Sequence, residues 1–475
     1  MENAEKVFHF FEEISRIPRS SGDEKAISEY LVSFAKERGL EVMRDDIFNV
    51  IIKKPATVPD CTCAPVIIQG HTDMVYVRED GCERAYEDGI KLIYKDGWLT
   101  ADGTTLGTDN GIAVAYALAL LDSSDIPHPD IEAVFTVSEE IGLVGAGHLN
   151  YTMLKGKYLL NIDTEDEGIF YTSCAGAFRN DLRIPIARER LEGLCRLNVN
   201  IHELKGGHSG MEINEGRANA ISLMARVLMK LGGDIHISSI KSEGKTNAIS
   251  NNASAELYVE ESMLESIEKR IKAMETEFKG EYGKRDSISI ELIRGDKQSA
   301  DCYDEDSRKK VISAMTLLPC GVMGMSFDIP DLVETSANPA HIDQLENELV
   351  ILSSARSCVG SRKEEMKARY GAVADLCDGI STCSADYPQW EYRADSPLRE
   401  LAIETYRELF GKEAKTGAIH AGLECGYFDE KLHGVDIISY GPDIFDVHTP
   451  AERANINSIE RIWVFTQSIL KKLAK

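Results

Sequence analysis

Two histidines and three carboxylates stand where apolar segments begin or end, which is where open α/β sheets carry their sites. His71 follows the apolar run VIIQG, Asp109 comes directly before NGIAVAYALALL, and Glu140 follows IEAVFTVSE. Asp163 follows YLLNI, and His448 comes after the short segment DIFDV. Imidazole and carboxylate groups are ligands of zinc and manganese, and a set of this size suits a pair of such ions. The residues therefore predict metal-assisted hydrolysis.

Each of these signals also fits a structural role when it is taken alone. The pair His71 and Asp73 is typical of a capped turn, although in an extended segment this carboxylate also lies on the side where it can orient the imidazole. Asp109 suits a helix N-cap as well as a bridge between two ions. Glu139 and Glu140 are adjacent, so their side chains diverge, and one can bind metal while the other faces water. The joint arrangement of these residues favours the metal site.

The segments around these residues alternate between strand and helix patterns. Apolar runs predict four strands, and a continuous apolar stretch predicts a helix between the second and the third of them. Apolar strands separated by helices indicate an α/β layer with a mixed central sheet flanked by helices. The expected strands are residues 48–54, 65–70, 131–137 and 157–162, and the expected helix is residues 110–124.

From about residue 188 the pattern changes to strand, helix, strand, strand, and then to a second round of helices and strands that ends near residue 387. A helix at 398–411 and an apolar strand at 435–445 then resemble the first part again. We therefore expect one domain interrupted by another. The expected ranges are 1–185 and 386–475 for a catalytic domain, and 186–385 for an inserted α+β lid domain.

The composition excludes several classes of partner. The chain has 475 residues, with 53 Lys plus Arg against 79 Asp plus Glu, and a net charge of −26 disfavours nucleic acid and anionic membranes as partners. No apolar run approaches the roughly 18 residues of a membrane helix, and the acidic start MENAEKVFHFFEEI does not resemble a signal peptide. The 11 cysteines are scattered, as expected for reduced thiols. We therefore expect a cytoplasmic enzyme.

Seven motifs, in order along the chain, resemble the M20 metallopeptidase family: GHTDMV, LGTDNGIAVA, EEIGLVGA, NIDTEDEG, GGHSGMEINEGRANA, HAGLECG and DVHTPAE. The resemblance covers essentially the whole chain. It is greatest to the aminoacyl-histidine dipeptidase branch, also called Xaa-His dipeptidase, peptidase D or carnosinase-like peptidases. By this resemblance His71 and Asp163 would hold one metal ion, Glu140 and His448 the other, and Asp109 would bridge them.

The resemblance also implies roles in catalysis. Glu139 would be the general base that takes a proton from the attacking water and passes it to the leaving amine. Asp73 would orient His71. His208 in the GGHSG motif would approach the scissile carbonyl as an oxyanion donor, from the same subunit or from a partner subunit.

Substrate-binding residues are expected at three further positions. Arg356 is suited to pair with a substrate carboxylate, and Asn247 to hydrogen-bond the substrate backbone, although a structural role fits both equally well. Gly422 in HAGLECG would let the substrate's terminal carboxylate approach backbone amides. His420 in the same motif is more typical of a structural residue.

The expected reaction is hydrolysis of unblocked dipeptides, with Xaa-His substrates such as β-alanyl-histidine leading and broader dipeptide activity beside them. The expected cofactors are two divalent metal ions, zinc before manganese or cobalt. The expected partner is the small dipeptide, with neither nucleic acid nor membrane, and a homodimer through the lid follows from the family. The alternatives are an amidohydrolase that removes an acyl group from an amino acid, and a peptide-binding protein without catalytic activity.

Overall fold

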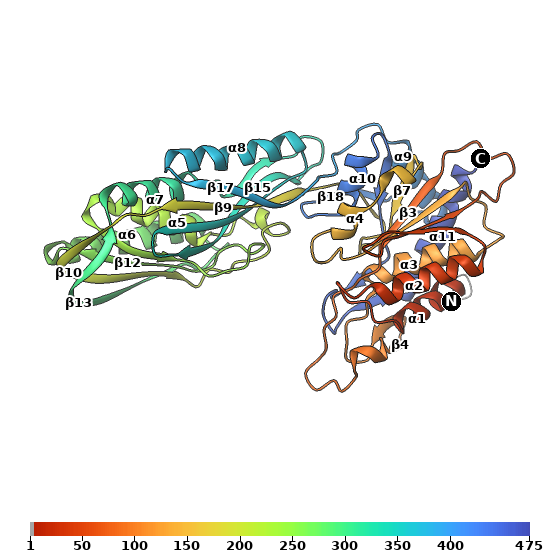
Figure 1. Cartoon of the computed structure of the whole chain (residues 1–475), viewed down its shortest axis with the longest axis horizontal. Coiled ribbons are helices and arrows are strands. Elements are labelled where there is room, and N and C mark those ends of the chain that lie inside the picture. The colour runs from red at the N-terminus through yellow and green to blue at the C-terminus, as the bar shows by residue number, and fades with distance from the viewer. Residues whose placement is uncertain (1–3) are drawn as a thin grey trace. The chain divides into compact units, whose positions relative to one another are not determined.

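A computed structural model describes residues 4–475, which form two compact units (Figure 1). The first unit contains the chain up to Cys174, Gln389–Ala418 and Leu423–Lys475. The second unit contains Ala175–Pro388 and Ile419–Gly422. Residues 1–3 of the expected catalytic domain lie outside the described residues.

The first unit is built on an eight-stranded sheet in which parallel and antiparallel pairs are mixed. Strands β6, β3, β7 and β19 are parallel neighbours, and β3 and β6 are buried along their whole length, as expected for strands covered on both faces. In order across the sheet the strands are β1 (Glu41–Arg44), β2 (Val50–Lys54), β6 (Ile131–Thr136), β3 (Val66–His71), β7 (Tyr158–Asn161), β19 (Asp436–Ser439), β8 (Ile169–Cys174) and β18 (Lys415–Ile419).

Helices pack on both faces of this sheet, and the apolar side chains between sheet and helices form the hydrophobic core. Helix α3 is apolar around its whole circumference and is buried between the sheet and other helices, where the Tyr116 ring stacks on Trp463 at 5.9 Å. Figure 1 shows α1, α2 and α3 along one side of the sheet. The helices are α1 (Glu5–Ser15), α2 (Lys25–Glu37), α3 (Thr108–Asp122), α4 (Val144–His148), α9 (Pro397–Phe410), α10 (Cys425–Lys431) and α11 (Ile456–Leu473). A small antiparallel sheet contains β20 (Ile444–Phe445), β21 (Arg453–Asn455), β5 (Trp98–Ala101) and β4 (Leu92–Lys95).

The second unit has two antiparallel sheets and four helices that share a hydrophobic core. One sheet has the order β14 (Gly321–Met325), β15 (Val333–Gln344), β16 (Glu348–Ser357), β9 (Gly176–Pro185) and β17 (Ile380–Tyr387). The other has the order β11 (His236–Lys241), β12 (Ala253–Val259), β10 (Arg188–His202) and β13 (Ser289–Tyr303). The helices are α5 (Ala220–Leu231), α6 (Leu264–Tyr282), α7 (Glu305–Leu317) and α8 (Gly360–Leu376).

The predicted fold class is confirmed: a mixed central sheet flanked by helices is accompanied by separate antiparallel sheets. The units divide at different residues from the expected ranges, because 176–185 form β9, whose backbone pairs with β16 and β17 of the second unit. The amphipathic helix α6 was not among the predicted elements, although its buried residues recur at helical spacing. None of the helices within 4–475 combines the length and apolar character that a membrane span needs.

Candidate metal centre

Three neighbouring parallel strands bring four of the predicted residues to one edge of the sheet. His71 is the last residue of β3, and it lies opposite Thr136, the last residue of β6, which leads into Glu139 and Glu140. On the other side of β3, strand β7 ends at Asn161 and leads into Asp163. The carboxyl ends of these strands therefore gather an imidazole and three carboxylates in one place.

Asp109 lies at the start of α3 and does not cap it, because the N-cap is Gly107 and Asp109 itself has non-helical backbone angles. Its two carboxylate oxygens face different histidines. Oδ1 is 3.2 Å from Nε2 of His71, and Oδ2 is 3.1 Å from Nε2 of His448. The peptide bond between Asp109 and Asn110 is cis. Of the two roles left open by the sequence, this geometry favours the bridge.

Each histidine has a second carboxylate partner. Nε2 of His71 is 3.4 Å from Oδ1 of Asp163, and Nε2 of His448 is 2.8 Å from Oε1 of Glu140. His71, Asp109 and Asp163 therefore form one group and Asp109, Glu140 and His448 another, with donor atoms in each group within 4.8 Å of one another. The five predicted ligands come together as two groups that share Asp109.

The spacing of these atoms fits divalent metal ions. Two atoms that each lie about 2.0–2.1 Å from one tetrahedral zinc ion are about 3.3 Å apart. The separations of 3.2 and 3.4 Å from the His71 imidazole to Asp109 and Asp163 are close to that value. Imidazole and carboxylate are also ligands that zinc, manganese and cobalt share, so the set fits a metal pair without selecting the element.

The charges of the site favour bound cations. Burial opposes protonation of His71, but the Asp163 carboxylate and hydrogen bonds to Asp109 and Asp163 outweigh it and hold its pKa well above the usual value. Hydrogen bonds to Asp109 and Glu140 raise the pKa of His448 to about 11. The raised pKa values of both imidazoles reflect the negative charge of the carboxylates around them, a charge that bound metal ions would also balance.

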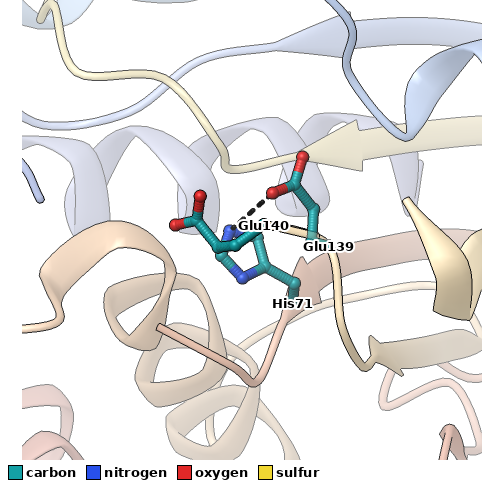
Figure 2. A group of neighbouring side chains, drawn as sticks. All are labelled: His71, Glu139 and Glu140. Atoms are coloured by element: carbon teal, nitrogen blue, oxygen red, sulfur yellow. Dashed lines mark ion pairs between the residues drawn. The ribbon is translucent and has the colours of Figure 1, made fainter. Parts of the chain in front are cut away.

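Glu139 lies beside the two groups, with Oε2 4.0 Å from Nε2 of His71 (Figure 2). Figure 2 shows the side chains of Glu139 and Glu140 pointing apart on either side of the imidazole, as expected for adjacent residues after a strand. Burial and the nearby charges of Asp163 and Glu424 raise the pKa of Glu139 well above its usual value. This carboxylate is near the two ligand groups, and with His71 and Glu140 it forms a further group whose donor atoms lie within 4.8 Å of one another.

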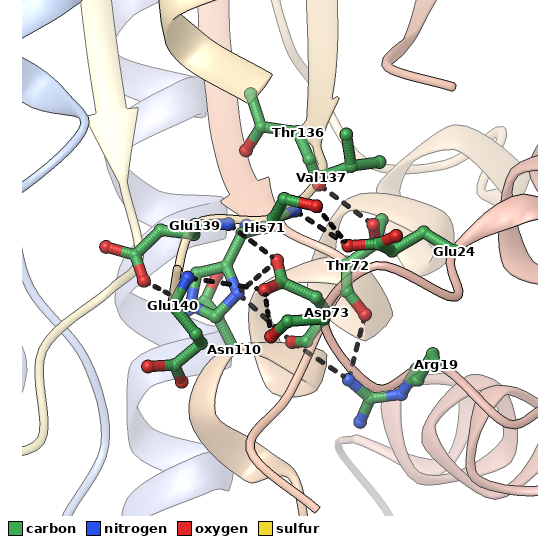
Figure 3. A network of polar contacts seen from close by, with 12 residues as sticks. Arg19, Glu24, His71, Thr72, Asp73, Asn110, Thr136, Val137, Glu139 and Glu140 are labelled. Carbon is green, nitrogen blue, oxygen red and sulfur yellow. Dashed lines mark hydrogen bonds and ion pairs between the residues drawn. The ribbon is translucent and has the colours of Figure 1, made fainter. Parts of the chain in front are cut away.

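Asp73 makes the predicted contact with His71 and several others. Its Oδ1 is 3.3 Å from Nδ1 of His71, while its carboxylate also accepts the backbone amides of Glu139 and Glu140 at 3.0 and 3.3 Å. The hydroxyl of Ser21 donates to Oδ2 at 2.7 Å. One fully buried carboxylate thus lies against the imidazole, whose Nδ1 is also 3.1 Å from the Asp73 carbonyl, and it holds the backbone of the segment that carries Glu139 (Figure 3).

The four predicted residues of the second unit lie near one another. A Cβ added to Gly210 would be 3.1 Å from the His208 ring and 3.2 Å from Nε of Arg356. Arg356 donates to the hydroxyl of Tyr387 at 3.1 Å, and a Cβ added to Gly422 would be 2.7 Å from that tyrosine ring. The carbonyl of Asn247 accepts the amide of Ser209, next to His208. Gly422 therefore makes room for an aromatic ring, a contact that the sequence did not predict.

Two buried glutamates near the candidate metal centre were not among the residues predicted from the sequence. Glu424 accepts hydrogen bonds from the side chains of Gln69 and Thr136, and burial raises its pKa to about 7. Glu452 accepts the amides of three consecutive residues, 106–108. Both glutamates lie inside motifs that carry the family resemblance, HAGLECG and DVHTPAE, and this position in the sequence could have indicated a role near the site.

The site lies at the carboxyl ends of strands in a mixed α/β sheet, and one carboxylate is shared by two ligand groups that each contain a histidine. This architecture is typical of a metal-dependent hydrolase. The chain belongs to the peptidase family M20/M25/M40, whose sequence pattern matches residues 67–472. The resemblance inferred from the motifs is confirmed.

Two relatives are similar over nearly their whole length. The cytosol non-specific dipeptidase of Escherichia coli is 32% identical over 474 residues, which cover 98% of this chain and 97% of the relative. The crystal structure of aminoacylhistidine dipeptidase from Vibrio alginolyticus is 33% identical with a TM-score of 0.90, covering 98% of this chain and 96% of that one. The aminopeptidase PepT structure from Bacillus cereus, at 17% identity and a TM-score of 0.57 over 99% of both chains, shares the fold.

Proposed function

We propose that this protein is a metal-dependent dipeptidase that hydrolyses unblocked dipeptides, with Xaa-His dipeptides as the leading substrates. The observation that carries the proposal is the position of Asp109, whose two oxygens face His71 and His448 separately. Full-length similarity to a non-specific dipeptidase and to an aminoacylhistidine dipeptidase supports the substrate class.

Two divalent ions, zinc before manganese or cobalt, are the proposed cofactors. His71 and Asp163 would hold one and Glu140 and His448 the other, with Asp109 shared between them. Such ions, when bound, supply a polarised carbonyl and a water of lowered pKa. The three carboxylates of Asp109, Glu140 and Asp163 would provide the negative charge that retains them.

Glu139 is the proposed general base. It stands beside the ligand groups, so its carboxylate can accept a proton from the attacking water and return it to the leaving amine. Asp73 keeps the His71 ring oriented through Nδ1, which leaves Nε2 directed at the carboxylates.

The proposed substrate-binding groups are in the second unit. The guanidinium of Arg356 suits a substrate carboxylate, and His208 is the proposed oxyanion donor, in its own or a partner subunit. Asn247 and Gly422 complete the proposed set. A homodimer and a cytoplasmic location are also proposed, the latter supported by the name of the Escherichia coli relative.

The test is metal-dependent hydrolysis by purified protein that is stripped with a chelator and reloaded with zinc or manganese. We expect amino acids to be released from β-Ala-His, Gly-His and Leu-Gly, and not from a tripeptide or from N-acetyl amino acids. His71→Ala and Glu139→Ala, both correctly folded, should lose this activity. Cleavage of the acetylated compounds alone would identify an amidohydrolase, and no turnover with any metal would favour a binding protein.

A further inference from the structure

The turn from Arg19 to Glu24, which joins α1 to α2, contacts three loops at the sheet edge: those that follow β3 and β6 and the one that precedes α3 (Figure 3). Its backbone pairs with the residue after Asp73, because Ser20 and Met74 form a parallel bridge and the amide of Met74 donates to the Arg19 carbonyl at 3.1 Å. No predicted site residue lies in this turn, so its contacts need a separate explanation.

Arg19 joins two of the loops. Its guanidinium donates to the carbonyls of Thr72 at 3.0 Å and Gly107 at 2.6 Å, although the side chain is completely buried. A Cβ added to Gly107 or Gly111 would lie 2.7 or 2.5 Å from Nη2 of Arg19. The two glycines on either side of Asp109 therefore make room for this guanidinium, which fixes the loop of Asp109 against the loop of Asp73.

Glu24 holds the third loop. Oε1 accepts the amide of Ser138 at 2.8 Å and its hydroxyl at 2.7 Å, in addition to the amide of Gly22 at 2.9 Å. Glu24 is the N-cap residue of α2, yet its side chain makes no capping hydrogen bond to that helix. Its carboxylate is directed to the loop of Glu139 instead. Ser138 is buried, so its amide and hydroxyl would be left unsatisfied without the Glu24 carboxylate.

Ser138 needs this support because its backbone is left-handed, with φ of +52°. A residue other than glycine is uncommon in this conformation, and it persists where the surroundings fix it. The next two amides, of Glu139 and Glu140, donate to Asp73 at 3.0 and 3.3 Å. Two buried carboxylates, Glu24 and Asp73, thus hold three consecutive amides, and this fixes the direction in which the Glu139 side chain leaves the backbone.

We propose that Glu24 is a positioning residue for Glu139, acting through the left-handed backbone of Ser138, and that Arg19 supports the same arrangement by fixing the neighbouring loops. This inference rests on the proposed dipeptidase function with Glu139 as general base. Glu24 acts through hydrogen bonds that its Oε1 accepts, so an uncharged side chain of the same shape can replace it.

The test compares three variants of the metal-loaded enzyme with wild type. Glu24→Ala removes the acceptor, and Glu24→Gln keeps an oxygen at its place. Glu132→Ala is the matched control, because Glu132 is also a buried carboxylate that accepts two backbone amides, those of Lys155 and Gly156 at 2.8 and 3.0 Å. It lies at the other end of β6, about 13 Å along the strand from Thr136.

For Glu24→Ala we expect kcat for β-Ala-His to fall about 100-fold, because a displacement of about 1 Å in a reacting group has an effect of this size. KM should stay within about twofold of wild type, since a group that acts on the chemical step leaves substrate binding unchanged. Glu24→Gln should restore kcat to within about threefold. Amide hydrogen exchange of the peptide 137–143 should be faster in Glu24→Ala only, while Glu132→Ala keeps wild-type kcat even where it is less stable.

The inference is wrong if Glu24→Ala hydrolyses the dipeptide as fast as wild type, or if Glu132→Ala loses kcat to the same extent. A Glu24→Gln variant that folds and is as inactive as Glu24→Ala would also overturn it. If wild type itself hydrolyses no dipeptide, the proposed function is wrong, and the inference is overturned with it. The wild-type assay therefore separates the two failures.

Discussion

The carboxylate of Glu452 accepts hydrogen bonds from both the amide and the hydroxyl of Thr108, at 2.8 and 2.6 Å. Thr108 directly precedes Asp109, and Glu452 follows His448 by four positions. This contact joins a turn near residue 450 to a loop near residue 108, and it places the two residues that face each other, Asp109 and His448, in a fixed relation.

Replacing Glu452 should destabilise the protein strongly. Glu452→Ala leaves the amides of residues 106–108 without an acceptor in a buried region, and we expect the free energy of unfolding to fall by about 3 kcal/mol. Glu452→Gln keeps one acceptor oxygen and should lose less. Urea unfolding of the metal-free proteins measures both, and equal stability of Glu452→Ala and wild type would contradict the role of this carboxylate.

Removing the metal should lower the melting temperature. Bound ions stabilise the folded state by an amount that reaches about 2.7 kcal/mol when their free concentration is a hundred times the dissociation constant. We expect the melting temperature to rise when zinc is added back to chelated wild-type protein. Asp109→Ala, which removes the carboxylate shared by both groups, should show little rise. A wild-type melting temperature that is insensitive to zinc and manganese would argue against the metal centre.

Glu139→Gln should separate catalysis from metal binding. General base catalysis contributes about 100- to 10,000-fold, so kcat should fall by a factor in this range. Glu139 is not one of the five proposed ligands, so the variant should retain the wild-type metal content, measured by elemental analysis after gel filtration. A variant that loses its metal along with its activity would move Glu139 into the ligand set.

The pH dependence of stability should reveal Glu424. Burial raises its pKa from 4.5 to about 7, so between these values the folded protein holds a proton that the unfolded chain has released. The stabilisation is complete below pH 4.5 and is lost as the pH rises through about 7, by about 3 kcal/mol in total. Glu424→Gln should lack this loss. We expect urea unfolding with chelator to show the variant gaining on wild type from pH 5 to pH 8, and parallel curves would refute the prediction.

Gly111→Ala should destabilise α3, although alanine normally favours a helix. The added Cβ would lie 2.5 Å from the buried Arg19 guanidinium, and overpacking of this kind costs about 1–3 kcal/mol. Gly371 in α8 is the control, because a Cβ there meets no atom within 4 Å. Gly371→Ala should stabilise the protein by up to about 1 kcal/mol. Thermal unfolding of the two variants should therefore shift in opposite directions.

The sequence was informative wherever a residue's role depends on its own segment. The apolar run at 65–70 predicted β3, the stretch at 110–124 predicted α3, and the ligand candidates at their ends followed from the general position of sites in α/β sheets. The expected boundary at residue 185 differs from the end of the first unit at Cys174, because the pairing of β9 with β16 and β17 assigns that strand to the second unit.

Residues that act through distant partners could not be predicted in this way. Glu452 and Thr108 are 344 positions apart, and Glu24 and Ser138 are 114 positions apart. A glutamate at the start of a helix is typical of an N-cap, so nothing near Glu24 in sequence indicates that its carboxylate supports another loop. Such roles depend on the three-dimensional fold.

The place of β19 in the central sheet has a consequence for synthesis on the ribosome. This strand, Asp436–Ser439, lies between β7 and β8, both of which are made more than 250 residues earlier. A nascent chain that has not yet reached residue 436 therefore carries two open strand edges inside its first unit, and such edges are prone to pair with other chains. Asp109 also lacks its second histidine at that stage. We expect the emerging protein to need shielding by chaperones until β19 is inserted, and the proposed metal pair could be completed only afterwards.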